Sequence, residues 1–379
     1  MAGAAINDST ARIGQPVAAV TVLASEAGGE TRSYTRLVGD RSSSSPAEAR
    51  PGPTAVDCHV HVIPRRLTRE SGSRRPDAPS VRQEAGKPLI EYGGTTVRST
   101  LHDISSIEDL LANAGAHGVG HVLACPWVQL LGDLIGSESE ALSACRDQNR
   151  AFAELTGPHL SALGSVPMQS ATLAASELER VMDLGLKGIE VAATIGGLHL
   201  GDDAFEPVWA AAERLGALVF VHPTLRGIQS PTMGSYYLAN AAGNPLETGL
   251  TAAHLVFSGA LERHPELRVL LSHGGGALPS LRGRLDRAWR VQPAARSRLQ
   301  GPPGDSLRRL FYDTVVHDSQ VLRQLVEFVG PSQVLMGTDY PFDMGLDDPV
   351  TFVEGAGLDA AAEQAVLGGN ASGLLGIAP

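Results

Sequence analysis

The sequence predicts a (β/α)8 barrel, a TIM-like fold in which eight parallel strands alternate with helices. Two observations favour this fold class. From residue 55 onward, short apolar runs of strand length alternate with segments of helical spacing. The chain of 379 residues also has room for a barrel, which uses about 250 residues before insertions. A doubly wound open sheet is the competing fold, but no G-x-G-x-x-G motif follows the first strand.

Eight candidate strands follow one another along the chain. They cover residues 55–59, 119–124, 160–166, 188–191, 218–222, 269–273, 310–313 and 334–339. Between them, residues 171–184 carry apolar side chains at helical spacing, and residues 204–215 are rich in helix formers. Each strand is thus followed by a helix or a long loop, as a barrel requires.

The first 54 residues are predicted to form an N-terminal extension, separate from the barrel at 55–379. Residues 19–25 and 32–38 are candidate strands on either side of Gly28 and Gly29, which suit a turn. Serine, proline and glycine then dominate at 41–46 and 51–53, as in flexible linkers. We expect a small hairpin or a partly disordered segment without catalytic residues.

Composition excludes several classes of protein. A formal net charge of -11 argues against non-specific nucleic-acid binding, which needs Lys and Arg to neutralise phosphates. The three cysteines, Cys58, Cys125 and Cys145, are too few for a disulfide scaffold or a four-cysteine zinc site. No apolar run approaches the about 20 residues of a membrane span, and no signal-peptide pattern is visible. We therefore expect a cytoplasmic protein without nucleic-acid or membrane partners.

Five side chains that can bind metal stand at strand ends. His59 and His61 lie two residues apart on the first strand and therefore point the same way. His222, His273 and Asp339 each end a later strand, and the carboxyl ends of barrel strands converge on one face. A lone H-x-H is weak evidence, and a single strand-end histidine usually only makes hydrogen bonds. Five such residues on four strands nevertheless predict a metal site.

Nitrogen and carboxylate ligands suit Zn²⁺, with Mn²⁺ or Fe²⁺ as alternatives. A second ion would need a bridging anion at the tip of the fourth strand, whereas Lys187 lies at the start of that strand. We therefore predict one divalent ion with a bound water. Its predicted ligands are His59, His61, His222 and Asp339. His273 would remain free as a general acid or base beside the water.

Longer segments surround these residues. They are DCHVHVIP (57–64), FEPVWAAAERLGALVFVHP (205–223), LSHGGGALP (271–279), FYDTVVHD (311–318) and VLMGTDYPF (334–342). H-x-H alone is generic, but VHP, HGGG and GTDYPF together are specific. Over about residues 55–352 the chain resembles the amidohydrolase superfamily. Within it, the chain is similar to the branch typified by 2-amino-3-carboxymuconate 6-semialdehyde decarboxylase. The resemblance implies one zinc-like ion on the four proposed ligands, with His273 as acid and base.

The resemblance also implies two substrate-binding arginines, each suited to pair with a carboxylate through its planar fork. Arg98 matches an arginine of the insertion after the first strand, and Arg284 matches one donated across a dimer interface. A homodimer and a small carboxylate substrate are therefore implied, although the arginines around 284 equally fit a solvated helix face. Leu198 and Thr224 replace tryptophans of the family, which leaves the substrate open.

The leading hypothesis is a metal-dependent, non-oxidative decarboxylase, that is, a carboxy-lyase. Its substrate would be a carboxylated muconate semialdehyde or a hydroxy- or amino-benzoate. The alternative is a metal-dependent hydrolase or hydratase of the same superfamily, acting on a small carboxylic acid, lactone or amide. A third reading, a barrel kept only as a binding module, is disfavoured by the intact ligand set. Only hydrolysis and hydration would place solvent oxygen in the product.

Overall fold

A computed structural model describes residues 19–25, 31–37, 55–73, 78–134, 136–225, 227–228 and 230–377. The chain divides into two compact units, Met1–Pro51 and Gly52–Pro379. In the first unit, β1 (Ala19–Ser25) and β2 (Thr31–Leu37) pair as antiparallel strands. The first strand has the predicted bounds and the second begins and ends one residue earlier. The expected turn glycines and the linker lie outside the described residues, so the boundary at residue 54 stays a prediction.

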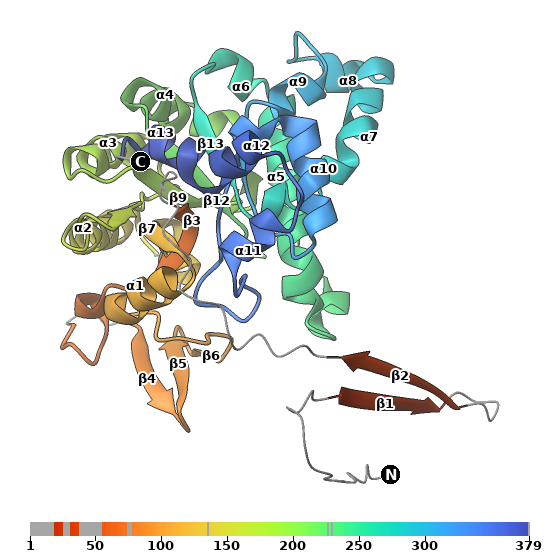
Figure 1. Cartoon of the computed structure of the whole chain (residues 1–379). Helices are drawn as coiled ribbons and strands as arrows, with labels where there is room; N and C mark the ends of the chain where they lie inside the picture. The colour runs from red at the N-terminus through yellow and green to blue at the C-terminus, as the bar shows by residue number, and fades with distance from the viewer. Residues whose placement is uncertain are drawn as a thin grey trace, which may run out of the picture. The chain divides into compact units, whose positions relative to one another are not determined.

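The second unit is a barrel of eight parallel strands (Figure 1). Its strands are β3 (Ala55–Val62), β7 (Val119–Pro126), β8 (Leu160–Ala162), β9 (Gly188–Ala192), β12 (Leu218–His222), β13 (Arg268–Leu271), β14 (Phe311–Asp313) and β15 (Val334–Leu335). Parallel bridges from Gly164 to Ile189 and from Val60 to Tyr340 join the two sheets into a closed ring. All eight predicted strands are present, and the predicted fold class is confirmed. The strands predicted at 160–166, 269–273 and 334–339 end earlier, at Ala162, Leu271 and Leu335, so His273 and Asp339 lie just beyond their strands.

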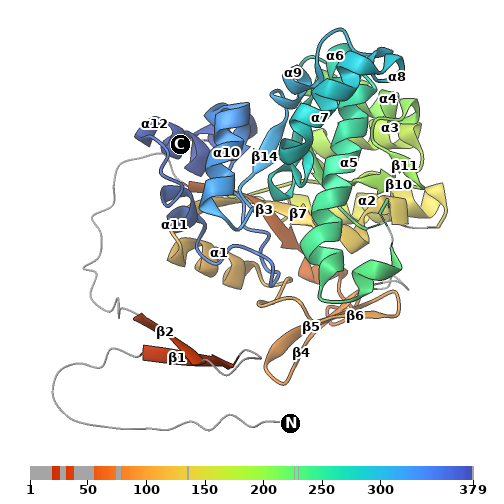
Figure 2. The ribbon, with the colours of Figure 1, turned by 90° about the vertical axis from the view of Figure 1, so that its right-hand side faces the viewer.

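Helices surround the strands in both views (Figure 1 and Figure 2). They are α1 (Ile107–Ala116), α2 (Glu138–Ala153), α3 (Ala171–Asp183), α4 (Glu206–Leu215), α5 (Asn244–Phe257), α6 (Ala260–Arg263), α7 (Leu278–Val291), α8 (Pro293–Arg296), α9 (Pro303–Leu307), α10 (Ser319–Val329), α11 (Pro349–Glu354), α12 (Ala360–Gln364) and α13 (Asn370–Leu375). The helical patterns at 171–184 and 204–215 correspond to α3 and α4. No helix among the described residues is both long and apolar enough to cross a membrane.

A three-stranded antiparallel sheet follows β3 and was not expected from the sequence. It consists of β4 (Ser80–Glu84), β5 (Lys87–Tyr92) and β6 (Thr95–Val97). The short hairpin β10 (Thr194–Ile195) and β11 (Leu198–His199) follows β9. Both additions lie after the carboxyl ends of barrel strands, where insertions can shape a site.

Residue alternation along the strands decides which side chains reach the barrel interior. On β12, Val219 and Val221 belong to the large core between barrel and helices, whereas Leu218 and Phe220 belong to a separate interior cluster. Side chains two residues apart on a strand share a face. His222 follows the same alternation as Leu218 and Phe220. It therefore points into the barrel interior, at the carboxyl end of the strands, rather than toward the helices.

The barrel is closed between β3 and the segment that follows β15. Asp57 accepts hydrogen bonds from the Thr338 hydroxyl at 2.5 Å and from the Thr338 amide at 3.0 Å. The Asp339 amide donates to the His59 carbonyl at 2.8 Å. A Cβ at Gly337 would lie 2.8 Å from the Cβ of His59, so only glycine permits this approach. The closure places Asp339 directly beside the two histidines of β3.

We expect Thr338→Val to lower the free energy of unfolding by about 1–3 kcal/mol, because it leaves a buried oxygen of Asp57 without its donor. Urea unfolding of the full chain measures this loss. Thr351→Val, the same change at an exposed position of α11, is the matched control and should be nearly neutral. Equal unfolding midpoints for the two variants would contradict the closing role of Thr338.

Candidate metal centre

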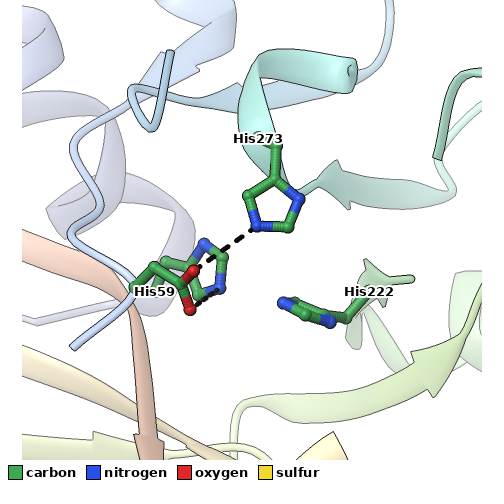
Figure 3. Close-up of side chains that lie close together, drawn as sticks. His59, His222 and His273 are labelled. Carbon is green, nitrogen blue, oxygen red and sulfur yellow. Dashed lines mark ion pairs between the residues drawn. The ribbon is translucent and has the colours of Figure 1, made fainter. Parts of the chain in front are cut away.

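The five strand-end residues singled out in the sequence lie together at the carboxyl ends of the barrel strands. The Nε2 atoms of His59 and His61 are 3.1 Å apart. Asp339 Oδ1 lies 3.3 Å from each of them. His222 and His273 join from β12 and from the turn after β13, and ligand atoms of His59, His222, His273 and Asp339 all lie within 4.8 Å of one another. Figure 3 shows the rings of His59, His222 and His273 around a common space.

The opposite nitrogen of each expected histidine ligand is held by a hydrogen-bond acceptor. His61 Nδ1 donates to the Pro126 carbonyl at 3.0 Å, and His222 Nδ1 donates to the Pro223 carbonyl at 2.9 Å. His59 Nδ1 donates to a carboxylate oxygen of Asp313 at 2.6 Å. Because a carbonyl can only accept, these contacts fix the proton on Nδ1 and turn the Nε2 lone pair toward the centre. This is the arrangement of histidines that bind metal.

Asp313, at the end of β14, organises two of the histidines and was missed in the sequence. Besides His59, it accepts from the backbone amides of His273 at 2.9 Å and Gly274 at 2.7 Å. Burial would raise the pKa of Asp313, but its hydrogen bond and charge interaction with His59 lower it. Asp313 ends the predicted strand 310–313, so the criterion that selected Asp339 also selects it.

The residues fit a divalent cation. The Nε2 atoms of His59 and His61 face each other at 3.1 Å, so they need either a proton or a cation between them, and a cation can bind both lone pairs. His222 Nε2 and Asp339 Oδ1 are buried and make no hydrogen bond with any described residue. A buried polar atom of this kind is costly without a partner. An ion at the centre would satisfy these atoms together.

Protonation states agree with metal binding. Burial, with repulsion from His61 and His273, lowers the pKa of His222 well below its usual value, so this imidazole is neutral. Burial would raise the pKa of Asp339, but the charge of His59 and the nearby imidazoles hold it well below its usual range. Burial also lowers the pKa of His59, yet Asp339 and Asp313 outweigh it and raise that pKa to about 10. A bound cation replaces this proton, because ligands bind metal in their deprotonated form.

His273 and Asp339 have unusual backbone conformations. Their φ angles are +56° and +64°, in the left-handed region that residues other than glycine seldom adopt. Such conformations cost about 1–3 kcal/mol each and concentrate at functional sites. The surrounding hydrogen bonds hold both residues in place, since the amide of His273 donates to Asp313 and the amide of Asp339 donates to His59.

A cavity of about 430 Å³ lies beside His222 and Asp339. Its aromatic lining residues are Tyr92, Trp127 and Phe342, and its amide-bearing lining residues are Gln129, Asn240 and Asn244. The Phe342 ring lies 5.5 Å from the His61 ring, between centroids, which connects the cavity wall to the metal ligands. None of these wall residues was singled out in the sequence, because they stand outside the barrel strands: in the inserted sheet, in short helical turns, at the start of α5 and in loops. Trp127 directly follows β7 and could have been noticed as a strand-end residue.

The loop after β12 is held by a buried carboxylate. Glu247 on α5 accepts from the backbone amides of Thr224 and Gly227, each at 2.8 Å, and also from the amide of Leu225. Thr224 and Leu225 line the cavity beside His222. Glu247 therefore fixes part of the cavity wall.

Neither predicted substrate arginine lies in this cavity among the described residues. Arg98 stands between Val97 and Ser99, which do line it, but its side chain is exposed and pairs with Glu84 at 2.8 Å. Arg284 lies on the exposed face of α7. Both roles stay predictions. Thr224 and Leu198 were the two residues expected to replace tryptophans of the family in the cavity wall. Thr224 does line the cavity, whereas Leu198 lies in a separate cavity with His199 and His254.

Glu190, in the fourth barrel strand β9, was also missed. It is buried, and its ligand atom lies within 4.8 Å of those of His61 and His222. Burial raises the pKa of its carboxyl group well above the usual value. In the sequence, the anion expected on this strand was a modified lysine, and Lys187 stands at the start of the strand rather than at its tip.

Comparison with known proteins places the chain in a family. The family model described as amidohydrolase matches residues 56–377. The chain is 34% identical over 221 residues to the 2-amino-3-carboxymuconate-6-semialdehyde decarboxylase of Dictyostelium discoideum, covering 57% of this chain and 61% of that relative. The match thus spans about three fifths of the relative's length.

Two solved structures show the same fold. Metarhizium anisopliae IDCase, in its apo form, superposes with a TM-score of 0.74 at 20% identity, covering 86% of this chain and 97% of the other. A dihydroxybenzoic acid decarboxylase from Polaromonas sp. JS666, with bound manganese and the inhibitor 2-nitroresorcinol, gives a TM-score of 0.68 at 21% identity. That superposition covers 86% of this chain and 97% of the other.

We expect Asp313→Asn to weaken divalent-metal binding by about 10- to 100-fold, as loss of partners behind metal ligands commonly does. Competition with a chromophoric chelator measures the affinity. Asp318→Asn is the matched control, because Asp318 only caps α10, where asparagine serves equally well. Equal affinities of the Asp313 variant and the wild type would show that Asp313 does not support the centre.

Proposed function

The chain belongs to the amidohydrolase family, and on this premise we propose that it is a metal-dependent, non-oxidative decarboxylase, that is, a carboxy-lyase. One observation carries the proposal. The buried Nε2 atoms of His59 and His61 face each other and Asp339, and neither His222 Nε2 nor Asp339 Oδ1 makes a hydrogen bond within the described part of the chain. A divalent cation among these atoms would satisfy all of them at once. The likeness to a curated decarboxylase supports the choice of reaction.

The proposed cofactor is one divalent ion, Zn²⁺ first and Mn²⁺ as the alternative, because nitrogen and carboxylate donors suit both. Its proposed ligands are His59, His61, His222 and Asp339. When bound, such an ion acts as a Lewis acid that polarises an oxygen of the substrate and stabilises developing negative charge.

His273 is the proposed acid and base. Its Nε2 lies 3.6 Å from Asp339 Oδ2, and its amide is anchored on Asp313. In decarboxylation the carbon–carbon bond to the carboxylate breaks and its electron pair stays on the substrate carbon. His273 Nε2 then delivers a proton to that carbon as carbon dioxide leaves. Asp339 keeps this nitrogen turned toward the centre.

The cavity supports an aromatic substrate. Tyr92, Trp127 and Phe342 provide flat apolar surface, as a benzoate ring requires. The nearby amides of Gln129, Asn240 and Asn244 can bond hydroxyl or amino substituents. We therefore place a hydroxy- or amino-benzoate ahead of a carboxylated muconate semialdehyde.

Three further assignments belong to this proposal. Arg98 and Arg284 bind substrate carboxylate, with Arg284 reaching the site of a second subunit in a homodimer. Arg98 adjoins two cavity-lining residues, and Arg284 is exposed and able to meet a partner. A reducing cytoplasmic location is supported by Cys58, Cys125 and Cys145, which are buried and form no disulfide bond among the described residues.

The reaction is tested by anaerobic assay of the metal-loaded full chain with a panel of such acids. In deuterated, ¹⁸O-labelled water we expect carbon dioxide, deuterium on the carbon that lost the carboxylate, and no ¹⁸O in the organic product. Solvent oxygen in that product would indicate a hydrolase or hydratase instead. A protein that takes up little metal and turns over no member of the panel would be a binding module.

His273→Gln should lower kcat by about 10²- to 10⁴-fold, the usual worth of a general acid or base, while metal content is retained. Steady-state kinetics and metal analysis of the same sample measure both. His159→Gln, at an exposed histidine that bonds the Gly120 carbonyl, is the control and should keep wild-type kcat. A His273 variant with unchanged kcat would remove this residue from the chemistry.

Arg98→Ala and Arg284→Ala should each raise KM about tenfold or more, the cost of losing a charged hydrogen bond. Arg82→Ala, on the same inserted sheet, and Arg287→Ala, on the same helix, are their controls.

Subunit mixing tests the transfer of Arg284 across an interface. If Arg284 acts on the neighbouring site, mixed dimers of the Arg284→Ala and His273→Gln chains contain one intact site and regain activity. No recovery on mixing, or unchanged KM in the alanine variants, would contradict these assignments.

A further inference from the structure

Glu190 is a buried carboxyl group that the proposed mechanism does not use. Its residue is 1% exposed, and neither carboxylate oxygen makes a hydrogen bond with any described residue. It pairs in register with Phe220 of β12, an interior residue, and alternates with Ile189 and Val191 of the outer core. Its side chain therefore points into the barrel and toward the end where the histidines stand.

Two proposed metal ligands lie next to this carboxyl group. Ligand atoms of His61, Glu190 and His222 lie within 4.8 Å of one another. Two ligands of one zinc-sized ion stand up to about 4.2 Å apart, twice a metal–ligand bond. The 4.8 Å limit exceeds this separation by about 0.6 Å, and the glutamate side chain has three rotatable bonds through which it can adjust.

The surroundings of Glu190 leave few ways to satisfy it. As an unpaired carboxylate it would suffer a large desolvation cost. As a neutral acid its hydroxyl would still lack an acceptor among the described residues. Its two neighbours, His61 and His222, turn their Nε2 lone pairs toward the centre, because each donates through Nδ1 to a backbone carbonyl. A cation shared with these histidines satisfies the carboxylate.

We propose that Glu190 is a further ligand of the divalent ion, contributed by the fourth barrel strand. This inference rests on the metal centre of the proposed function. With Asp339 and Glu190 both ionised and the histidines neutral, two negative charges balance a divalent cation in a buried site. An added carboxylate oxygen also raises the number of ligands and favours ions that prefer oxygen. We therefore assign the site a greater preference for Mn²⁺ than it would have with Asp339 as its only carboxylate ligand.

Cobalt binding to the full chain tests the assignment without any activity assay. The visible absorption of Co²⁺ becomes stronger as the number of its ligands falls from six to five to four, so the loss of one ligand is visible in the spectrum. Glu190→Gln keeps the shape of the side chain but removes its charge. We expect the variant to show a more intense cobalt spectrum than the wild type and a Kd for Mn²⁺ at least about tenfold higher. The affinity for Zn²⁺ should fall less.

Glu177→Gln is the matched control. Glu177 is equally buried, but it is held by Arg146, Arg180 and Asn149 on the side of α3. This variant should leave the cobalt spectrum and the Mn²⁺ affinity unchanged. Glu190→Asp, which retains a carboxylate, should recover part of the Mn²⁺ affinity and guards against a folding defect in the glutamine variant.

Two results would overturn the inference. One is a Glu190→Gln protein with the wild-type cobalt spectrum and Mn²⁺ affinity. The other is an infrared band of a protonated carboxylic acid that is present in the metal-loaded wild type and missing from the variant. A wild-type chain that binds no cobalt would instead overturn the metal-dependent function, and this inference with it. Metal binding without decarboxylation would leave the Glu190 assignment standing.

Discussion

The whole site depends on the closure of the barrel between its first and last strands. Asp57 is buried beneath this seam and bonds both the hydroxyl and the amide of Thr338, while the Asp339 amide bonds the His59 carbonyl. These contacts join residues about as far apart in the chain as the barrel allows. They bring the only carboxylate of the predicted ligand set within 3.3 Å of two imidazoles.

Charge balance is the second constraint. Seven titratable side chains lie together at the carboxyl end of the barrel, where solvent hardly screens their charges. They are four imidazoles and the carboxylates of Asp339, Asp313 and Glu190. Asp313 already bonds His59 and two backbone amides, so its charge is largely satisfied. Asp339 Oδ1 and Glu190 are not satisfied in this way. The imbalance explains why one cation can hold together groups that would otherwise repel or remain unpaired.

The sequence allowed the barrel and its ligands to be predicted, because strand order alone brings strand ends to one face. His222 and Asp339 needed no knowledge of loops to be placed together. Asp313 ends the predicted strand 310–313 and Glu190 stands in the predicted strand 188–191, so the same reasoning extends to both residues. The sheet β4–β6 was not predictable in this way: Arg82, Gln83 and Glu84 of β4 are exposed and show no apolar alternation. The same holds for the wall residue Tyr92, whose position depends on how that sheet folds.

Metal ligands and cavity wall therefore have different structural origins. The histidine ligands stand on β3 and β12, and Asp339 is bonded through its amide to β3, whereas the wall stands on segments that must find hydrogen bonds elsewhere. Glu247 provides them for the loop after His222, since one buried carboxylate takes the amides of Thr224, Leu225 and Gly227. A substitution at Thr224 can then reshape the cavity without moving His222, whose Nδ1 is held by the Pro223 carbonyl. The chemistry of the centre and the choice of substrate are thus free to vary separately.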